Sequence, residues 1–465
     1  MDVLARSALD QSSLLQTGAI SVEELLRAYL ARIEALDPEL RAFVQLLPDR
    51  AIARARALDR QRNKRSNRDA MGPLWGLPTA MKDLHMARGT FTRLGSRAFR
   101  YLWTPIDDVT TAAVRRSSMI VLGKLATSEL AILPFVHTEL APPTRNPWDL
   151  ARYSGGSSGG SSAAVASGLL PIAVASDGAG STRIPAAFCG LIGHKPTRGL
   201  VPNPFAPFEA LSLSTIGPHA RSVDDAAALL DVLAPEGPDA RTRSWARAAK
   251  EPLARPLRVK VTCESPIAEV QPVVKTAVDR VARALASLGH HVAEGVAVGG
   301  TVDEFIPMFR YLAREMFVPR ESALQPSTRY LRDDRHRTSK SSALEKRELF
   351  RAHVDRWLEG TDVYVTPTVA SLAPEVGRWS LDDGEALFHA IAPLGAFTAA
   401  FNASGNPAIS IPLWIEGAPV PVGVQLVGAR GYDGALLSLA RSVLEALGTP
   451  LCPLASLPAR TARAR

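Results

Sequence analysis

Six short apolar runs, with amphipathic stretches among and after them, constrain the fold of this chain more than any other feature. The runs occupy 119–125, 170–177, 257–262, 363–368, 408–413 and 422–428, and Gly and Pro bound them, which is typical of buried strands. Helical patterns cover 223–233, 272–288, 302–317, 341–358 and 432–447. Alternating strands and helices predict an α/β fold, here a single large domain with a central mixed sheet covered by helices on both faces.

The chain divides around this pattern. Residues 1–70 form a helical segment packed on the domain, because Ser21 and Glu24 make a capping box and a second helix is expected from Pro48 to Gln61. Residues 71–235 form the core that carries the candidate functional residues, and 236–256 read as a surface linker. Residues 257–447 complete the α/β core, and 448–465 form a tail.

Composition excludes several classes of protein. No apolar run approaches the roughly 18 residues that span a bilayer, and the N-terminus does not resemble a secretory signal. Three widely spaced cysteines form no CxxC pair, so we expect no metal site, no disulfide framework and a cytoplasmic location. The net charge is +8, but the arginines are spread rather than clustered with aromatics, which argues against nucleic-acid binding.

The stretch "YSGGSSGGSSAAVASG", Tyr153 to Gly168, concentrates glycine and serine. It is not a linker, because a helix and a buried strand follow at once. It has the P-loop spacing but lacks the Lys-Ser/Thr that meets phosphates. Gly155–Gly159 also satisfies G-x-S-x-G, so an α/β-hydrolase-like esterase with Ser157 as nucleophile and His389 as base stays open, although no strand precedes the loop.

Two further segments carry candidate chemistry. In "SDGAGSTRIPAAFCG" an apolar run ends at Asp177, and a tight turn leads to Ser181 at the start of an expected helix. Backbone N–H groups that converge beside such a serine can stabilise an oxyanion. In "GLPTAMKDL" an apolar approach leads to Lys82.

Together, "PTAMKDL", "GGSSGGSSAAVA" and "SDGAGSTRIPA" resemble the amidase signature family of serine hydrolases, in the same order and spacing. The resemblance continues through "LIGHKPTRGLVP", "FNASGNPAISIPL" and "PVGVQLVG", and covers roughly residues 20–447. It implies an amidase that hydrolyses a carboxamide, taken here as a linear one, to a carboxylate and ammonia or an amine.

The resemblance also implies the site. Ser181 would be the nucleophile of an acyl-enzyme, Ser157 a bridging serine after a cis peptide bond, and Lys82 the base. A lysine has a pKa near 10.4 in water, so burial must lower it before the amine can accept a proton. The implied oxyanion hole consists of the N–H groups of Gly178, Ala179, Gly180 and Ser181. The implied supporting residues are Gly156, Ser158, Asp177 and Arg183.

The substrate is expected to be a small amide in contact with Phe135, Thr138 and Phe205. No metal, organic cofactor, nucleic acid or membrane is needed, and the resemblance allows a homodimer. An alternative is a glutaminase-type subunit of a tRNA-dependent amidotransferase, which acts only in a complex. A free-standing enzyme would instead release ammonia from simple amides by itself.

Overall fold

The computed structural model describes residues 2–62, 71–234, 237 and 244–456. Among these residues the larger sheet has eight strands. Three neighbouring strands at one side run parallel and the remaining pairings are antiparallel, so the predicted mixed sheet is confirmed. In spatial order the strands are β10 (His291–Glu294), β9 (Arg258–Val261), β11 (Val363–Pro367), β13 (Val422–Gly428), β12 (Ala408–Leu413), β7 (Ile192–Lys195), β8 (Thr215–Ala220) and β6 (Ile172–Asp177).

Both faces of this sheet are covered, and strand β13 shows how the sequence achieves it. Successive side chains of a strand point to opposite faces. Gly423 and Gln425 face helix α6 (Arg183–Cys189): a Cβ on Gly423 would lie 2.2 Å from Ala187 Cβ, and Gln425 Oε1 accepts from Arg183. The alternate residues are all apolar and buried, and they point to the other face, toward the helices α9 (Pro272–Ser287) and α15 (Asp433–Ala446).

A second, three-stranded sheet lies beside the first, in the order β1 (Phe43–Leu46), β5 (Ile120–Leu125), β2 (Pro78–Lys82). The apolar run at 119–125 therefore belongs to this smaller sheet rather than to the central one. Thr79 Oγ1 donates to Ile172 O at 3.0 Å and so joins β2 to the edge strand β6. A short pair, β3 (Thr90–Phe91) with β4 (Trp103–Thr104), follows β2.

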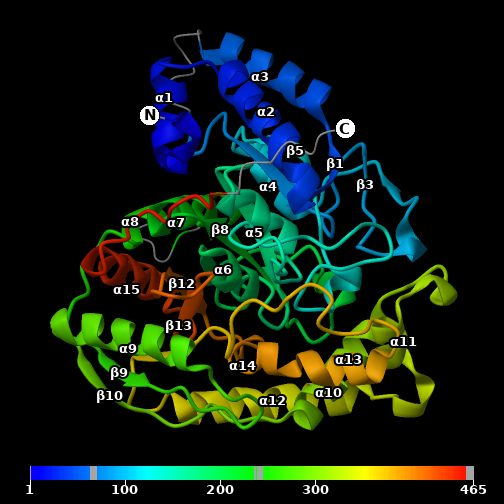
Figure 1. The fold of residues 1–465 in the computed structure, drawn as a ribbon, viewed down its shortest axis with the longest axis vertical. Coiled ribbons are helices and arrows are strands. Elements are labelled where there is room, and N and C mark those ends of the chain that lie inside the picture. Colours follow the sequence, from blue (N-terminus) through cyan, green and yellow to red (C-terminus); the bar gives the residue numbers. More distant parts are fainter. Residues whose placement is uncertain (1, 63–70, 235–236, 238–243, 457–465) are drawn as a thin grey trace.

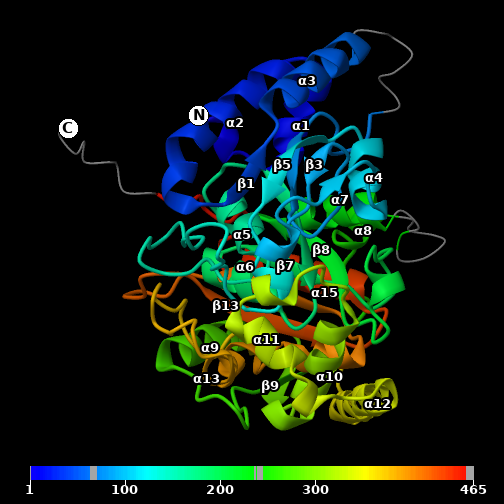
Figure 2. The ribbon, with the colours of Figure 1, turned by 90° about the vertical axis from the view of Figure 1, so that its right-hand side faces the viewer.

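The N-terminal helices form one end of the molecule (Figures 1 and 2): α1 (Ala8–Thr17), α2 (Val22–Leu40) and α3 (Pro48–Arg62). The predicted capping box is present, because Ser21 Oγ accepts from Glu24 N at 3.1 Å and Glu24 Oε2 accepts from Ser21 N at 2.8 Å. Buried Asp225 of α7 (Val223–Leu233) accepts from the backbone N–H of Ala8, which attaches the first helix to the domain.

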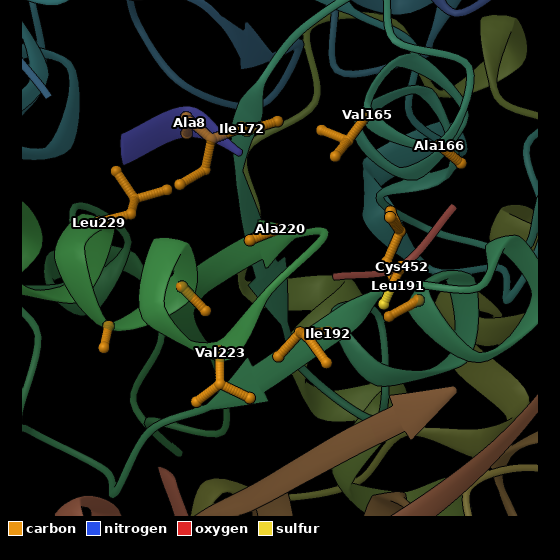
Figure 3. Packing of buried hydrophobic residues seen from close by; sticks show 14 of the residues in the cluster. Ala8, Val165, Ala166, Ile172, Leu191, Ile192, Ala220, Val223, Leu229 and Cys452 are labelled. Atoms are coloured by element: carbon orange, nitrogen blue, oxygen red, sulfur yellow. The ribbon is translucent and has the colours of Figure 1, made fainter. Parts of the chain in front are cut away.

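Apolar side chains from the edge of the central sheet pack against α7 (Figure 3). Ile172, Ile192 and Ala220 come from three adjacent strands, and Leu229 comes from the helix; all are fully buried. Complete burial contributes about 1.5–3 kcal/mol for each isoleucine or leucine side chain. Cys452 joins the same cluster, so the described part of the predicted tail is packed on the domain.

The remaining helices complete the layers. One group lies at the end opposite α1–α3 in Figures 1 and 2: α10 (Val302–Glu315), α11 (Pro326–Arg332), α12 (Lys340–Trp357), α13 (Gly384–Ile391) and α14 (Ala399–Ser404). The others are α4 (Val109–Arg116), α5 (Gly159–Ala166) and α8 (Trp245–Ala248). Within the described chain, no helix is long and apolar enough to cross a membrane.

The expected surface linker at 236–256 is only partly described, since 236 and 238–243 lie outside the described residues. In the remainder, Trp245 is 3% exposed and its indole donates to Ala234 O at 3.0 Å. Ser244 Oγ donates to Asp231 of α7. The described part of this stretch is therefore bound to the domain through a buried tryptophan.

Candidate active site

A strand end and a glycine-rich loop bring two of the predicted residues, Lys82 and Ser157, into contact. Lys82 ends β2, Ser157 lies just before α5, and Ser181 follows β6 at the junction of the two sheets. Lys82 Nζ lies 2.7 Å from Ser157 Oγ and 2.8 Å from Ser176 Oγ. Ser176 was not among the predicted residues; its signal was a hydroxyl near the end of an otherwise apolar strand.

The environment of Lys82 favours its neutral form. The side chain is fully buried, and burial lowers its pKa to about 7, although the nearby Asp177 carboxylate partly opposes the shift. The adjacent carboxylate of Asp83 forms an ion pair with Lys124 at 3.0 Å. A large share of the Lys82 amine is therefore unprotonated at neutral pH.

The two positions before Ser157 require glycine for different structural reasons. Gly155 has a φ of +85°, which disfavours any side chain. A Cβ on Gly156 would lie 2.5 Å from the backbone nitrogen of Phe135, so only glycine fits there. The Gly156–Ser157 peptide bond is cis, as the family resemblance implies. Ser158 Oγ then donates to Ser176 O at 3.2 Å, which ties the loop to the end of β6.

Asp177 organises the turn that carries Ser181. Its Oδ1 accepts from Gly180 N at 2.6 Å, and its Oδ2 accepts from Thr182 N at 3.2 Å and from Arg183 Nε at 2.9 Å. Burial alone would raise the pKa of Asp177, but the Arg183 guanidinium, the charge of Lys195 and the hydrogen bond from Asn402 hold it well below its usual range. The carboxylate thus holds both sides of the turn around Ser181.

Arg183 is fully buried, and this allows a stability prediction. Its other nitrogens donate to Gln425 Oε1 and Asn402 Oδ1, both at 2.7 Å. Replacing it with methionine leaves the Asp177 carboxylate buried without its counter-ion, which costs about 3–5 kcal/mol. We expect Arg183→Met to lower the free energy of unfolding by that amount in urea titrations. Arg56→Met, which removes an exposed ion pair, is the matched control and should change it little.

The predicted oxyanion donors are not equivalent. The Gly180 N–H is taken up by Asp177 Oδ1, whereas in the described residues no protein acceptor is recorded for the N–H groups of Gly178, Ala179 and Ser181. Thr398 Oγ1 donates to Ala179 O at 2.7 Å and fixes the turn from the opposite side. Three of the four expected donors therefore remain available to a ligand.

A cavity of about 90 Å³ that opens to solvent is lined in part by Ser181. Its walls are apolar, and Phe309 of α10 meets Phe388 of α13 edge-on with ring centroids 6.2 Å apart. No charged side chain lines the cavity within the described residues. The principal lining residues are Ala179, Ser181, Ile184, Phe305, Phe309, Phe388 and Ile391.

The three residues predicted to contact the substrate have other surroundings than the lining of this cavity. Phe135 is fully buried against Tyr153, with ring centroids 4.7 Å apart, and Phe205 packs against His85 at 5.4 Å. Thr138 Oγ1 accepts from a backbone N–H two residues on. None of the three is among the described residues that line the cavity. The aromatic residues that do line it come from helices far along the chain, and their spacing alone gave no signal.

The segments that carry the candidate site residues lie in a stretch that matches a known family. A family model for Amidase matches residues 24–437, with the segments around Lys82, Ser157 and Ser181 all inside that range. The chain belongs to the amidase family. As in the sequence-based prediction, it is an amidase signature enzyme with an α/β fold and acts on amides.

Individual relatives of this amidase cover almost its whole length. The 6-aminohexanoate-cyclic-dimer hydrolase of Pseudomonas sp. (strain NK87) is 33% identical over 486 residues, which cover 96% of this chain and 95% of that protein. One subunit of the glutamyl-tRNA(Gln) amidotransferase of Synechococcus sp. (strain CC9605) is 32% identical over 93% of this chain and 94% of its own length. A solved structure of 6-aminohexanoate cyclic dimer hydrolase complexed with substrate has a TM-score of 0.86 at 30% identity, covering 96% and 98% of the two chains.

Proposed function

We propose that this amidase cleaves the C–N bond of a neutral, apolar carboxamide through an acyl-enzyme on Ser181. The observation that carries the proposal is the fully buried contact of Lys82 Nζ with Ser157 Oγ at 2.7 Å, and a cavity lined by Ser181 supports it. A buried amine with a pKa of about 7 is partly neutral at neutral pH, and next to a serine hydroxyl it can accept the hydroxyl proton. The same hydroxyl can then accept the proton of a second serine.

Acylation combines two proton transfers with the attack of Ser181 on the substrate carbonyl. The Ser181 hydroxyl proton passes to Ser157, whose own proton passes to the neutral Lys82 amine. Ser181 Oγ bonds to the carbonyl carbon, and the carbonyl π electrons move onto oxygen. The free N–H groups of Gly178, Ala179 and Ser181 stabilise this oxyanion.

The leaving group and the acyl group depart in turn. When the carbonyl re-forms, the C–N bond breaks, and the nitrogen takes the proton that returns from Lys82 through Ser157. This proton is essential, because an amide anion is a poor leaving group. Water then attacks the ester carbonyl on Ser181, and its proton passes through Ser157 to Lys82. As the ester C–O bond breaks, that proton returns through Ser157 to Ser181 Oγ, and the product leaves as a carboxylic acid that ionises in water.

The lining of the cavity favours an uncharged substrate. The acyl chain or ring of the amide would lie between Phe309, Phe388 and the aliphatic side chains of the cavity. Free glutamine carries an ammonium and a carboxylate, and their burial without partners is costly. The apolar walls therefore favour a free-standing amidase over a glutaminase subunit. Because one relative acts on a cyclic dimer, cyclic amides are candidates together with linear ones.

The esterase alternative, with Ser157 as nucleophile, has less support. Ser157 is fully buried and lies against Lys82, whereas Ser181 lines the cavity. His389, the base that this alternative requires, is exposed, and its Nε2 lies 3.5 Å from Tyr330 OH. Ser181 is thus the serine that a substrate in the cavity can reach.

A substrate panel tests the proposal. The purified chain alone should release ammonia from hexanamide or benzamide, or open the ring of a cyclic diamide to a linear product with a free amine, and should leave L-glutamine intact. Phe388→Ala removes an aromatic wall, and we expect KM for the apolar amides to rise about tenfold while kcat changes less. Hydrolysis of glutamine alone, or no hydrolysis without added subunits, would contradict the proposal and favour the amidotransferase alternative.

A further inference from the structure

A buried histidine that has no part in the proposed proton path contacts the backbone beside Ser181. His219 lies in β8, with no exposed surface, between its register partners Ala173 of β6 and Gly193 of β7. Its Nε2 is 2.6 Å from the carbonyl oxygen of Thr182, the residue that directly follows Ser181. A carbonyl oxygen only accepts, so Nε2 carries the hydrogen and donates it.

Gly193 shows independently how tightly the sheet meets this carbonyl. A Cβ on Gly193 would lie 2.7 Å from Thr182 O and 2.6 Å from Ala186 Cβ. The adjacent strand therefore leaves room for the Thr182 carbonyl only because position 193 has no side chain. Gly193 and His219, which pair in the sheet, therefore both contact the Thr182 carbonyl. Gly193 leaves space for it, and His219 forms a hydrogen bond with it.

The charge state of His219 suits this role. Burial lowers its pKa to about 4; the hydrogen bond to Thr182 opposes this shift, and the charge of the nearby Lys82 contributes to it. The imidazole is therefore neutral at neutral pH and places no additional positive charge beside the Lys82 amine. It acts as a fixed hydrogen-bond donor.

We propose that His219 is a positioning residue for Ser181, and that its hydrogen bond to Thr182 O fixes the height of the nucleophile above the sheet. This rests on the proposed function, in which Ser181 forms the acyl-enzyme. The Asp177 carboxylate accepts hydrogen bonds from backbone N–H groups of the turn, one on each side of Ser181. His219 holds the same turn through a carbonyl, so that the backbone around Ser181 is restrained by both donors and acceptors.

The test compares two substitutions at this position. His219→Met removes the donor at similar volume, and His219→Gln keeps an N–H that can reach the carbonyl. We expect His219→Met to lower kcat about tenfold with KM changed less than about twofold, since small displacements of a reacting group cost up to about 10²-fold in rate. Labelling of Ser181 by a fluorophosphonate should slow in parallel. His219→Gln should recover most of both rates.

His194→Gln is the matched control, because His194 is equally buried in β7 but its Nε2 contacts the Asp433 carboxylate instead of a carbonyl beside Ser181. It should leave kcat unchanged. Native kcat in His219→Met, or equal loss in His219→Met and His219→Gln at unchanged thermal midpoint, would overturn the positioning role. Full activity of Ser181→Ala would instead refute the proposed function itself, whatever the His219 variants do.

Discussion

Replacing Ser181 with alanine is expected to lower kcat for amide hydrolysis by about 10⁴-fold or more, because the step that forms the acyl-enzyme loses its nucleophile. Removal of a serine nucleophile elsewhere costs as much or more. The turn should stay folded, since Asp177 binds backbone N–H groups and the Arg183 side chain rather than the Ser181 hydroxyl. Ammonia release from hexanamide by equal amounts of folded protein measures the loss.

Covalent labelling identifies the serine that reacts. After treatment with a fluorophosphonate, intact mass and peptide mapping should place one adduct on Ser181. The adduct should be absent in Ser181→Ala and form slowly in Ser157→Ala, which keeps the nucleophile but loses the hydroxyl against Lys82. An adduct on Ser157 in the native protein would contradict the proposal and favour the esterase alternative.

The sequence was most informative where one local rule decides the structure. The capping box at Ser21 forms as predicted, and the helix expected at 223–233 has those bounds, because capping and periodicity are local signals. Strand β8 was missed. Its sequence "TIGPHA" contains Gly, Pro and His, and it is a strand because it pairs with both β6 and β7. Such pairing depends on residues distant in sequence.

The candidate site likewise has a part that local sequence signals reveal and a part that depends on long-range packing. Lys82, Ser157 and Ser181 lie in three compact motifs, so a family resemblance could locate them from the sequence alone. The lining of the cavity could not be found in this way. Phe309 and Phe388 come from α10 and α13, more than a hundred residues after Ser181, and only the packing of these helices brings them to the nucleophile. Ser176 likewise becomes a partner of Lys82 only when β2 and β6 lie side by side.

The pH dependence of the reaction should report the charge of Lys82. Because burial lowers its pKa to about 7, kcat/KM should rise through pH 7 as the amine becomes neutral and should level off above about pH 8. Below pH 7 it should fall about tenfold for each unit, since only the neutral amine accepts a proton. Lys82→Met should lower kcat by about 10³-fold and abolish this limb, because no base remains beside Ser157.

Lys195 provides the matched control for this experiment. It is also fully buried with a pKa lowered by burial to about 7, but its Nζ donates to the backbone oxygen of Pro196 rather than to a serine. If the limb reports Lys82, Lys195→Met should keep it and Lys82→Met should lose it. If the rise in kcat/KM with pH persists in Lys82→Met and vanishes in Lys195→Met, the titrating group is Lys195, and this would contradict the proposed role of Lys82. Two lysines with the same pKa in one core are thus distinguished by the group that each amine contacts.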